Sequence, residues 1–513
     1  MKPFIAMFGS VLGLVAGMAW AGPSFVDRAA SLANPPVYEG DWEHFVGGGV
    51  AILDCNGDRL PDLFVAGGTA PARLLQNTSQ TAGLVTFSDA DITPITGVTG
   101  AYPLDMDGDG QQDLAVLRVG PDLFLKGDGT CHFRDVTADW GLETGDHWTT
   151  AFTATWEQGQ SWPTLALGHY VDRANLDGPF QACDDNLLLR PNPTGGYGTR
   201  EALSPGYCAL SMLFSDWTRN GVPDLRISND RHYYVRGGYE EMWRLNPLAP
   251  YADEEWPRFS LWGMGIASRD ITGDGLPEVM MTSMGDQLLQ INLGKGQLAN
   301  APYGIGTYAQ IPYSGDDGRP STGWHAEFGD IDNDGRDDLF IAKGNVDQMP
   351  SNAIADPNNL LMQGADGTFT EAGGTSGIGT VHRSRGAGLA DLNGDGLLDI
   401  VVVNRRAALE IWQNTTQDTG NWLAIALDLP SGNRNAIGSW VELRHGDRTS
   451  AQEVTVGGGH VSGRAGPLHF GLGGATAAEV RVIWPGGTAS DWHVVPVNQT
   501  ITLSPDGTAL QIR

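Results

Sequence analysis

The chain has 513 residues and is strongly acidic, with 61 Asp and Glu against 31 Lys and Arg and a formal net charge of -30. Such a charge repels nucleic acid and anionic membrane surfaces, and it favours cations as ligands. The length predicts at least two domains. The 71 glycines and 29 prolines favour many short strands joined by tight turns.

Residues 1–21 have the pattern of a secretory signal peptide. Lys2 precedes an apolar run that ends Ala19-Trp20-Ala21, which places small residues at positions -3 and -1 of a cleavage site after Ala21. The alternative is a retained membrane anchor, because the run approaches the length that spans a bilayer. We expect cleavage and no membrane insertion afterwards, and hence a protein that is secreted, periplasmic or on the cell surface.

Four cysteines follow, and none stands in a CxxC pair, so a zinc site is not expected. In an oxidising compartment two disulfides are plausible. Cys183 and Cys208 bracket one loop-rich stretch and are the favoured pair. Cys55 with Cys131 is then the remaining option, which the sequence leaves open.

An acidic nine-residue stretch recurs seven times, at spacings between 51 and 61 residues. This period is typical of propeller blades. A short apolar strand follows most copies, and the flanks supply about four strands per repeat, which is the composition of one blade. The pattern predicts a seven-bladed β-propeller over residues 22–415. We number the stretches in chain order as loops 1 to 7: 54–62, 105–113, 156–164, 216–224, 270–278, 330–338 and 391–399.

Six of the loops carry oxygen-bearing side chains at positions 1, 3, 5 and 9, and position 9 is always acidic. Calcium takes six to eight oxygens, and glycine at position 6 permits the sharp turn that wraps such a loop around one ion. We therefore predict up to six Ca²⁺ sites. Their ligands are Asp54, Asn56, Asp58 and Asp62; Asp105, Asp107, Asp109 and Asp113; Asp216, Thr218, Asn220 and Asp224; Asp270, Thr272, Asp274 and Glu278; Asp330, Asp332, Asp334 and Asp338; and Asp391, Asn393, Asp395 and Asp399.

The alternative for each loop is a set of Asx-turns without metal. Loops 2 and 6 carry four carboxylates each and should bind best, whereas loop 4 has two and is the weakest intact loop. Loop 3 has Trp156, Gln158, Gln160 and Thr164 at the ligand positions. Because none of these is a carboxylate, we expect a blade without metal there.

Residues 421–513 alternate apolar and polar side chains, as in Trp422–Leu427 and Val480–Trp484, and predict a small all-β domain. The fold class predicted for the chain is therefore all-β, a seven-bladed propeller followed by a small C-terminal β-domain. Several motifs of this domain and of the propeller carry a family resemblance. They read Asn421-Trp-Leu-Ala-Ile-Ala-Leu427, Asn433-Arg-Asn-Ala-Ile-Gly438, His469-Phe-Gly-Leu-Gly473, Val482-Ile-Trp-Pro-Gly486, Tyr170-Val-Asp-Arg173, Cys183-Asp-Asp-Asn186 and Gly323-Trp-His-Ala-Glu327.

The loops and their flanks resemble the FG-GAP/VCBS repeats of integrin α-subunit propellers and of many bacterial surface proteins. The C-terminal motifs resemble, in order, the ASPIC/UnbV module of the cartilage acidic protein family. Animal members often end in a Cys-rich EGF-type module, whereas the last cysteine here is Cys208. The chain is thus similar to the bacterial type, and a cartilage role is not implied.

No nucleophile motif, zinc motif or nucleotide-binding loop stands in a convincing context. We therefore expect a non-enzymatic binding or adhesion protein whose ligand is a protein or a glycan. The alternative is a propeller enzyme, such as a lyase, a hydrolase or a quinone-dependent dehydrogenase. Its polar site would lie near the inner strands, at His325 and Glu327 and at His382, Arg383 and Arg385.

Overall fold

The structure, a computed structural model, describes residues 22–177, 181–230, 237–315, 318–446, 448–505 and 509–512. The predicted signal peptide, residues 1–21, lies outside the described residues. Strands dominate, which confirms the all-β fold class. In the described part of the chain no helix is long and apolar enough to cross a membrane. Among the residues that the structure describes, the helical turns are η1 (Ala29–Ser31), η2 (Trp42–His44), η4 (Tyr303–Ile305) and α1 (Gly373–Ser376).

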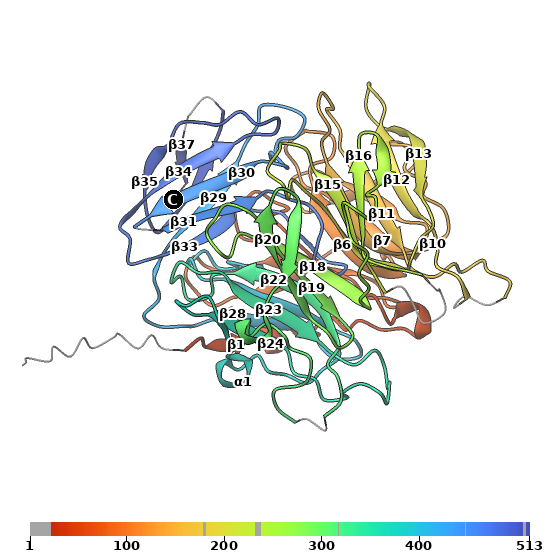
Figure 1. Cartoon of the computed structure of the whole chain (residues 1–513), viewed down its shortest axis with the longest axis horizontal. Helices are drawn as coiled ribbons and strands as arrows, with labels where there is room; N and C mark the ends of the chain where they lie inside the picture. Colours follow the sequence, from red (N-terminus) through yellow and green to blue (C-terminus); the bar gives the residue numbers. More distant parts are fainter. Residues whose placement is uncertain are drawn as a thin grey trace, which may run out of the picture.

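Among the described residues, β1 to β28 form seven four-stranded antiparallel units, which we call blades (Figure 1). A short pairing of β7 with β10 joins the second and third units into one sheet. Blades 1 to 3 are β2 (Val50–Leu53), β3 (Asp62–Val65), β4 (Arg73–Asn77) and β5 (Phe87–Ala90); β6 (Val98–Leu104), β7 (Asp113–Gly120), β8 (Leu123–Gly127) and β9 (Phe133–Asp135); and β10 (His147–Thr155), β11 (Thr164–His169), β12 (Asn186–Pro191) and β13 (Tyr197–Leu203). Blades 4 and 5 are β14 (Ala209–Ser215), β15 (Asp224–Asn229), β16 (Glu241–Leu245) and β17 (Leu248–Pro250); and β18 (Gly263–Arg269), β19 (Glu278–Ser283), β20 (Leu288–Gly294) and β21 (Gln297–Asn300). Blades 6 and 7 are β22 (Gly323–Gly329), β23 (Asp338–Lys343), β24 (Asn359–Gln363) and β25 (Phe369–Glu371); and β26 (Ser384–Ala390), β27 (Asp399–Asn404), β28 (Glu410–Asn414) and β1 (Phe25–Asp27).

The blades close into a ring. The first strand of each blade contacts the first strand of the next, and β26 contacts β2, so these strands surround a central channel. The N-terminal strand β1 completes the last blade, since Phe25 pairs with Asn414 of β28. The second strands are buried on both faces, which explains their continuous apolar runs, such as Ile400–Val403 in β27. Each acidic loop joins the first strand of its blade to the second.

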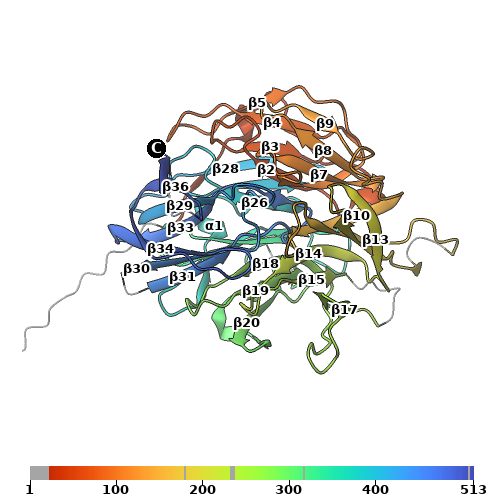
Figure 2. The ribbon, with the colours of Figure 1, turned by 90° about the horizontal axis from the view of Figure 1, so that it is seen from above.

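The C-terminal module is a sandwich of two four-stranded sheets that lies against the loop side of the ring (Figures 1 and 2). Leu423, Val441, Phe470, Val480 and Ile501 from the two sheets form its buried core. One sheet contains β33 (Leu468–Gly473), β29 (Asn421–Leu427), β36 (Gln499–Leu503) and β37 (Ala509–Ile512). The other contains β31 (Arg448–Glu453), β30 (Trp440–His445), β34 (Ala477–Ile483) and β35 (His493–Pro496).

A segment of this module enters the channel of the ring. We call residues 456–466 the plug. Its strand β32 (Gly463–Arg464) pairs in parallel with β2, and Gly458 and Gly459 donate backbone N–H groups to Met212 and Ile266 at 2.7 and 2.6 Å. A Cβ on Gly459, whose φ is +57°, would lie 2.4 Å from the ring of His325. The glycine run of the plug therefore permits its close approach to the inner strands.

The opposite end of the channel is filled by residues 42–49 and an aromatic cluster. Trp148, Tyr170 and Trp324 are fully buried there. The buried guanidinium of Arg385 lies 4.1 Å from the ring of Trp324 and donates to the carbonyl of Phe45 at 2.8 Å. The plug therefore occupies one end of the channel, and residues 42–49 occupy the other.

Candidate metal centres

In the six loops that have a carboxylate at position 1, that carboxylate binds the turn that follows it. Asp105 accepts N–H groups from Gly108 and Gly110, both at 2.8 Å. The N–H of Gly110 reaches back because this glycine has a φ of +89°. Loops 1, 4, 5, 6 and 7 repeat the arrangement through Asp54, Asp216, Asp270, Asp330 and Asp391.

The position 9 carboxylate joins the loop to the third strand of its blade. Asp399 accepts the N–H of Leu392 at 2.9 Å with one oxygen and the N–H of Asn414 at 2.7 Å with the other. Asp62, Asp113, Glu278 and Asp338 do the same. Asp224 differs, because Trp217 Nε1 and the Tyr251 hydroxyl donate to it at 2.8 and 2.7 Å. The acidic residue at position 9 therefore has a structural use besides any ligand role.

A polar residue at the end of the third strand links neighbouring blades, a role that the sequence analysis missed. The side-chain amide of Asn414 in blade 7 donates to the carbonyl of Ile331 in loop 6 at 2.9 Å. Asn77, Asn292 and Gln363 make the equivalent bond to the preceding loop. The repeated Asn or Gln at these strand ends was the available signal.

Three loops contain a side-chain oxygen without a partner at position 3. Asp107 Oδ1, Thr218 Oγ1 and Asn393 Oδ1 are buried and have no hydrogen-bond partner among the described residues. Each lies in a loop whose other oxygens already accept backbone N–H groups. Because a buried acceptor without a partner costs about 1–3 kcal/mol, these atoms are candidate ligands for a cation.

Burial also raises the pKa of the following loop carboxyls. It raises the pKa of Asp113 and of Glu278 to about 8, although backbone N–H groups oppose the shift. The pKa of Asp391 rises to about 7 through burial and the charge of Asp395. In loop 6, one oxygen each from Asp330, Asp332 and Asp338 lie within 4.8 Å of one another. A divalent ion would offset both the desolvation and the repulsion of these groups.

In blades 2 and 3 a basic side chain of the third strand lies against the loop. Lys126 Nζ contacts Asp107 and lies 2.6 Å from Asp109 Oδ2 in loop 2. In blade 3 the guanidinium of Arg190 lies 2.7 Å from Glu157 Oε1, which also accepts the Thr164 hydroxyl. Register shows that Lys126 and Arg190 occupy the same position of the third strand, since each follows the residue paired with position 10 of its loop. The guanidinium of Arg190 therefore supplies a positive charge at loop 3, and the ammonium of Lys126 binds two of the loop 2 carboxylates.

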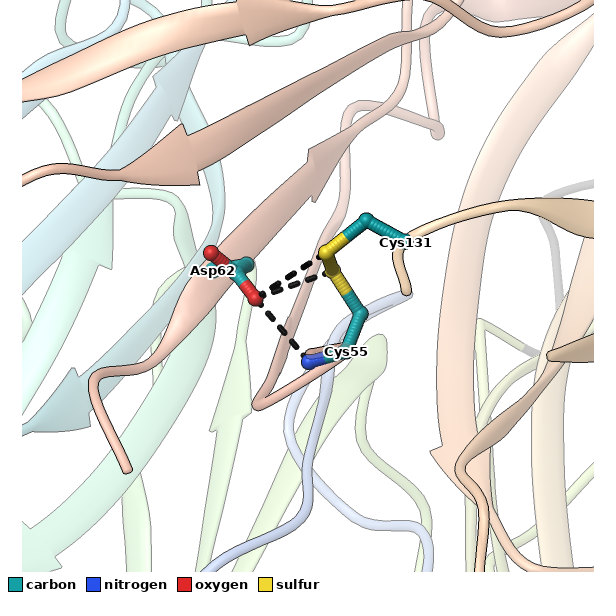
Figure 3. A group of neighbouring side chains, drawn as sticks. All are labelled: Cys55, Asp62 and Cys131. Carbon is teal, nitrogen blue, oxygen red and sulfur yellow. Dashed lines mark hydrogen bonds between the residues drawn. A yellow bond between two sulfur atoms is a disulfide. The ribbon is translucent and has the colours of Figure 1, made fainter. Parts of the chain in front are cut away.

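The position 9 residue of loop 1 lies beside a disulfide (Figure 3). Cys55 and Cys131 are bonded and connect loop 1 to blade 2. Asp62 Oδ2 accepts the N–H of Cys55 at 2.9 Å and lies 2.9 Å from its Sγ. The metal ligand form of cysteine is the thiolate, which a disulfide does not provide. Cys55, Asp62 and Cys131 therefore do not form a metal site. The second disulfide is Cys183–Cys208.

His147, His169 and Asp184 form a further cluster outside the loops. His147 Nδ1 lies 2.7 Å from Asp184 Oδ2, and the rings of the two histidines stack at 4.1 Å with an interplanar angle of 1°. Imidazole lone pairs lie in the ring plane, and two parallel planes do not meet. The two histidines therefore cannot direct lone pairs at one ion in this arrangement.

The polar residues of the alternative enzyme site do not form one cluster in the structure. His325 Nε2 lies 3.4 Å from Glu327 Oε2, and Arg464 of the plug lies 3.4 Å from the other oxygen. Burial opposes ionisation of Glu327, but these partners hold its pKa below the usual range. His382 instead lies 3.7 Å from Glu410. Arg383 lies 3.8 Å from Asp347, which also accepts from Arg405 at 2.9 Å.

A cavity of about 1030 Å³ lies between the loop side of the ring and the C-terminal module. Loop 1 contributes Asp54, Asp58 and Arg59 to its lining, and the module contributes Trp422 and Arg464. Loop 1 and the plug therefore line the same cavity.

The fold and the loops define the class first: an all-β protein with propeller-like blades and repeated acidic loops. Family profiles then specify the modules. The FG-GAP-like repeat profile matches residues 54–116 and 270–341, and the ASPIC and UnbV profile matches residues 429–509. The chain carries FG-GAP-like repeats and a C-terminal ASPIC/UnbV domain, as the resemblance predicted. Among curated protein sequences, none is significantly similar to this chain.

Solved structures with a similar outline include BBS1N in complex with ARL6DN, at 9% identity and a TM-score of 0.44, covering 78% of this chain and 99% of that chain. An Agrocybe aegerita lectin that recognises non-reducing terminal N-acetylglucosamine shares 16% identity, with a TM-score of 0.36 and coverage of 72% and 94%. The calcium structure of a Trichoderma reesei carbohydrate-active enzyme of family AA12 has 8% identity, a TM-score of 0.34 and coverage of 77% and 98%. All three TM-scores are below 0.5, and we infer no function from them.

Proposed function

We propose that this chain is an exported calcium-binding β-propeller that acts as a non-enzymatic binding or adhesion protein for a protein or glycan ligand. One observation supports calcium binding most directly: the position 3 oxygens of Asp107, Thr218 and Asn393 are buried without a hydrogen-bond partner. A cation that takes six to eight oxygens would bind these atoms together with the neighbouring carboxylates. In loop 6, Asp330, Asp332 and Asp338 would hold the ion in the same way.

Export is supported by the two disulfides, because such bonds persist in oxidising compartments. A binding role is supported by the cavity between the modules, whose size suits a ligand or the end of a larger one. Loop 1 lines this cavity, and no atom lies within 4 Å of a Cβ built on Gly57. A calcium ion in loop 1 would therefore remain close to solvent and to a bound ligand.

Calorimetry tests the calcium sites. At ten times the dissociation constant each site would add RT ln 11, about 1.4 kcal/mol, to the free energy of unfolding. Millimolar calcium should raise the melting temperature over EDTA, and magnesium should do so poorly because its octahedral shell is small. Identical melting curves in calcium, magnesium and EDTA would show that the loops are turns without metal.

The binding role needs a separate experiment. The purified protein is applied to a glycan array and to a panel of extracellular proteins, each with calcium and with EDTA, and to a substrate panel for lyase, hydrolase and dehydrogenase activity. We expect a calcium-dependent ligand and no turnover. Turnover that Glu327→Gln abolishes would instead favour the enzyme, and would overturn the proposed role.

A further inference from the structure

The C-terminal module rests directly on the calcium loops. Arg448 Nη1 donates to the carbonyl of Gly335 in loop 6 at 2.6 Å, and Thr449 Oγ1 donates to the carbonyl of Gly273 in loop 5 at 2.8 Å. Gly335 is the position 6 residue that turns its loop, with a φ of +89°. The two adjacent residues at the start of β31 therefore form hydrogen bonds with the backbone of two loops.

Loop 7 is contacted in the same way from the other sheet. His469 Nε2 donates to the carbonyl of Gly396 at 3.1 Å. A carbonyl only accepts, so this bond places the proton of His469 on Nε2. A Cβ on Gly396, the position 6 residue, would lie 1.9 Å from Trp422 Nε1. Only glycine fits between this loop and the module.

Loop 6 meets the module through Asn333 and through the predicted ligand Asp330. The N–H of Gly473 donates to the carbonyl of Asn333 at 2.8 Å. A Cβ on Gly471 would lie 1.8 Å from Oδ2 of Asp330, the position 1 carboxylate. The backbone of β33 thus lies against a carboxylate that would hold the ion.

These contacts require loops 5, 6 and 7 to hold one conformation. Without a cation, the carboxylates of a loop repel one another within a few ångströms, and the repulsion opens the turn. The carbonyls of Gly273, Gly335 and Gly396 would then move away from the hydrogen-bond donors of the module. We infer that calcium binding by these three loops and docking of the C-terminal module are thermodynamically coupled, an inference that rests on the proposed calcium sites.

The coupling extends to the plug, because the plug is part of the docked module. Gly458 and Gly459 hold the channel strands by backbone hydrogen bonds, and Ala465 donates to the carbonyl of Ile52 at 2.9 Å. Loss of docking leaves the plug held only by its own contacts in the channel, which are these bonds and the contacts of His460 and Arg464 with His325 and Glu327. Calcium therefore controls how firmly the channel is closed.

Hydrogen exchange of the full chain, read by mass spectrometry, tests the coupling. Peptides that cover the plug and β31 should exchange about tenfold faster in EDTA than in millimolar calcium, beyond any change in the peptides of β12 and β13, which make no hydrogen bond to the plug. Coupling is reciprocal, so Arg448→Met with Thr449→Val should weaken calcium binding by about threefold to tenfold in titration calorimetry. Arg444→Met is the matched control, since its guanidinium lies over Trp492 within the module.

The outcomes separate the two proposals. Absence of calcium binding in the titration would overturn both. Calcium binding with unchanged exchange of the plug, or with an affinity that Arg448→Met and Thr449→Val leave unaltered, would overturn the coupling and leave the calcium sites standing. Faster exchange of the plug in EDTA together with weaker binding in the double variant is the result expected.

Discussion

The backbone N–H of His460 in the plug donates to Nδ1 of His325 in blade 6 at 3.0 Å. Because Nδ1 accepts, the proton of His325 lies on Nε2, which faces Glu327 at 3.4 Å. Glu327 also accepts the N–H of Leu389 in blade 7 at 3.0 Å and lies 3.4 Å from Arg464. One carboxylate therefore joins two blades and the plug.

Glu327→Gln tests whether this carboxylate is structural. The amide keeps the shape but loses the charge that His325 and Arg464 bind, so we expect a loss of about 1–3 kcal/mol in the free energy of unfolding. The loss should be similar in calcium and in EDTA, because Glu327 lies outside the loops. Denaturant unfolding measures it, with the exposed Glu479→Gln as control. Unchanged stability would show that the carboxylate is not needed for the fold.

Lys126→Met tests the basic side chain in loop 2. A calcium ion in this loop must share Asp107 and Asp109 with the ammonium, so its removal should raise calcium affinity there by about threefold to tenfold. Stability in EDTA should fall, since these carboxylates lose their counter-charge. Titration calorimetry and thermal unfolding measure the two effects, with Arg134→Met, an exposed ion pair of the same blade, as control. Equal or weaker calcium affinity would mean that Lys126 does not compete with the ion.

Arg190→Met should behave differently, although the residue occupies the same strand position. Loop 3 has no carboxylate at its ligand positions, and Arg190 is the partner of the mostly buried Glu157. Leaving that carboxylate unpaired should cost about 1–3 kcal/mol. The cost should be the same in calcium and in EDTA when measured by denaturant unfolding. A loss that calcium restores would place an ion in loop 3.

The period of 51 to 61 residues and the acidic positions predicted the all-β fold and the loops, because both are encoded within short stretches of chain. The second use of position 9 was not visible, since Asp399 finds the N–H of Asn414 only after three strands have paired. Lys126 stands 17 residues beyond Asp109 and reaches it only through strand register. The plug was hidden for the same reason: His460 meets His325 across 135 residues. Sequence patterns within a short stretch therefore predict strands and loops, whereas the contacts between distant side chains are set only by the folded structure.

A pH effect is expected from His147. Its hydrogen bond to Asp184 raises the pKa of His147, and the same bond keeps the pKa of Asp184 low despite its burial. The folded state therefore holds the His147 proton more tightly than the unfolded chain, whose histidines titrate near about 6.5. The stabilisation is complete below that pH and is lost as the pH rises through the folded pKa. Burial lowers the pKa of His169 to about 4, so this second ring stays neutral beside it.

His147→Gln isolates the contribution. We expect the wild type to exceed the variant in free energy of unfolding at about pH 6, and the difference to shrink towards about pH 9 as His147 loses its proton in the wild type. Asp184 does not disturb the comparison, because its lowered pKa acts only in acid. Denaturant unfolding in millimolar calcium at both pH values measures the difference, and His132→Gln, an exposed histidine, is the control. A difference that grows with pH would contradict the sign of the shift, and a constant difference would mean that His147 packs against His169 without titrating.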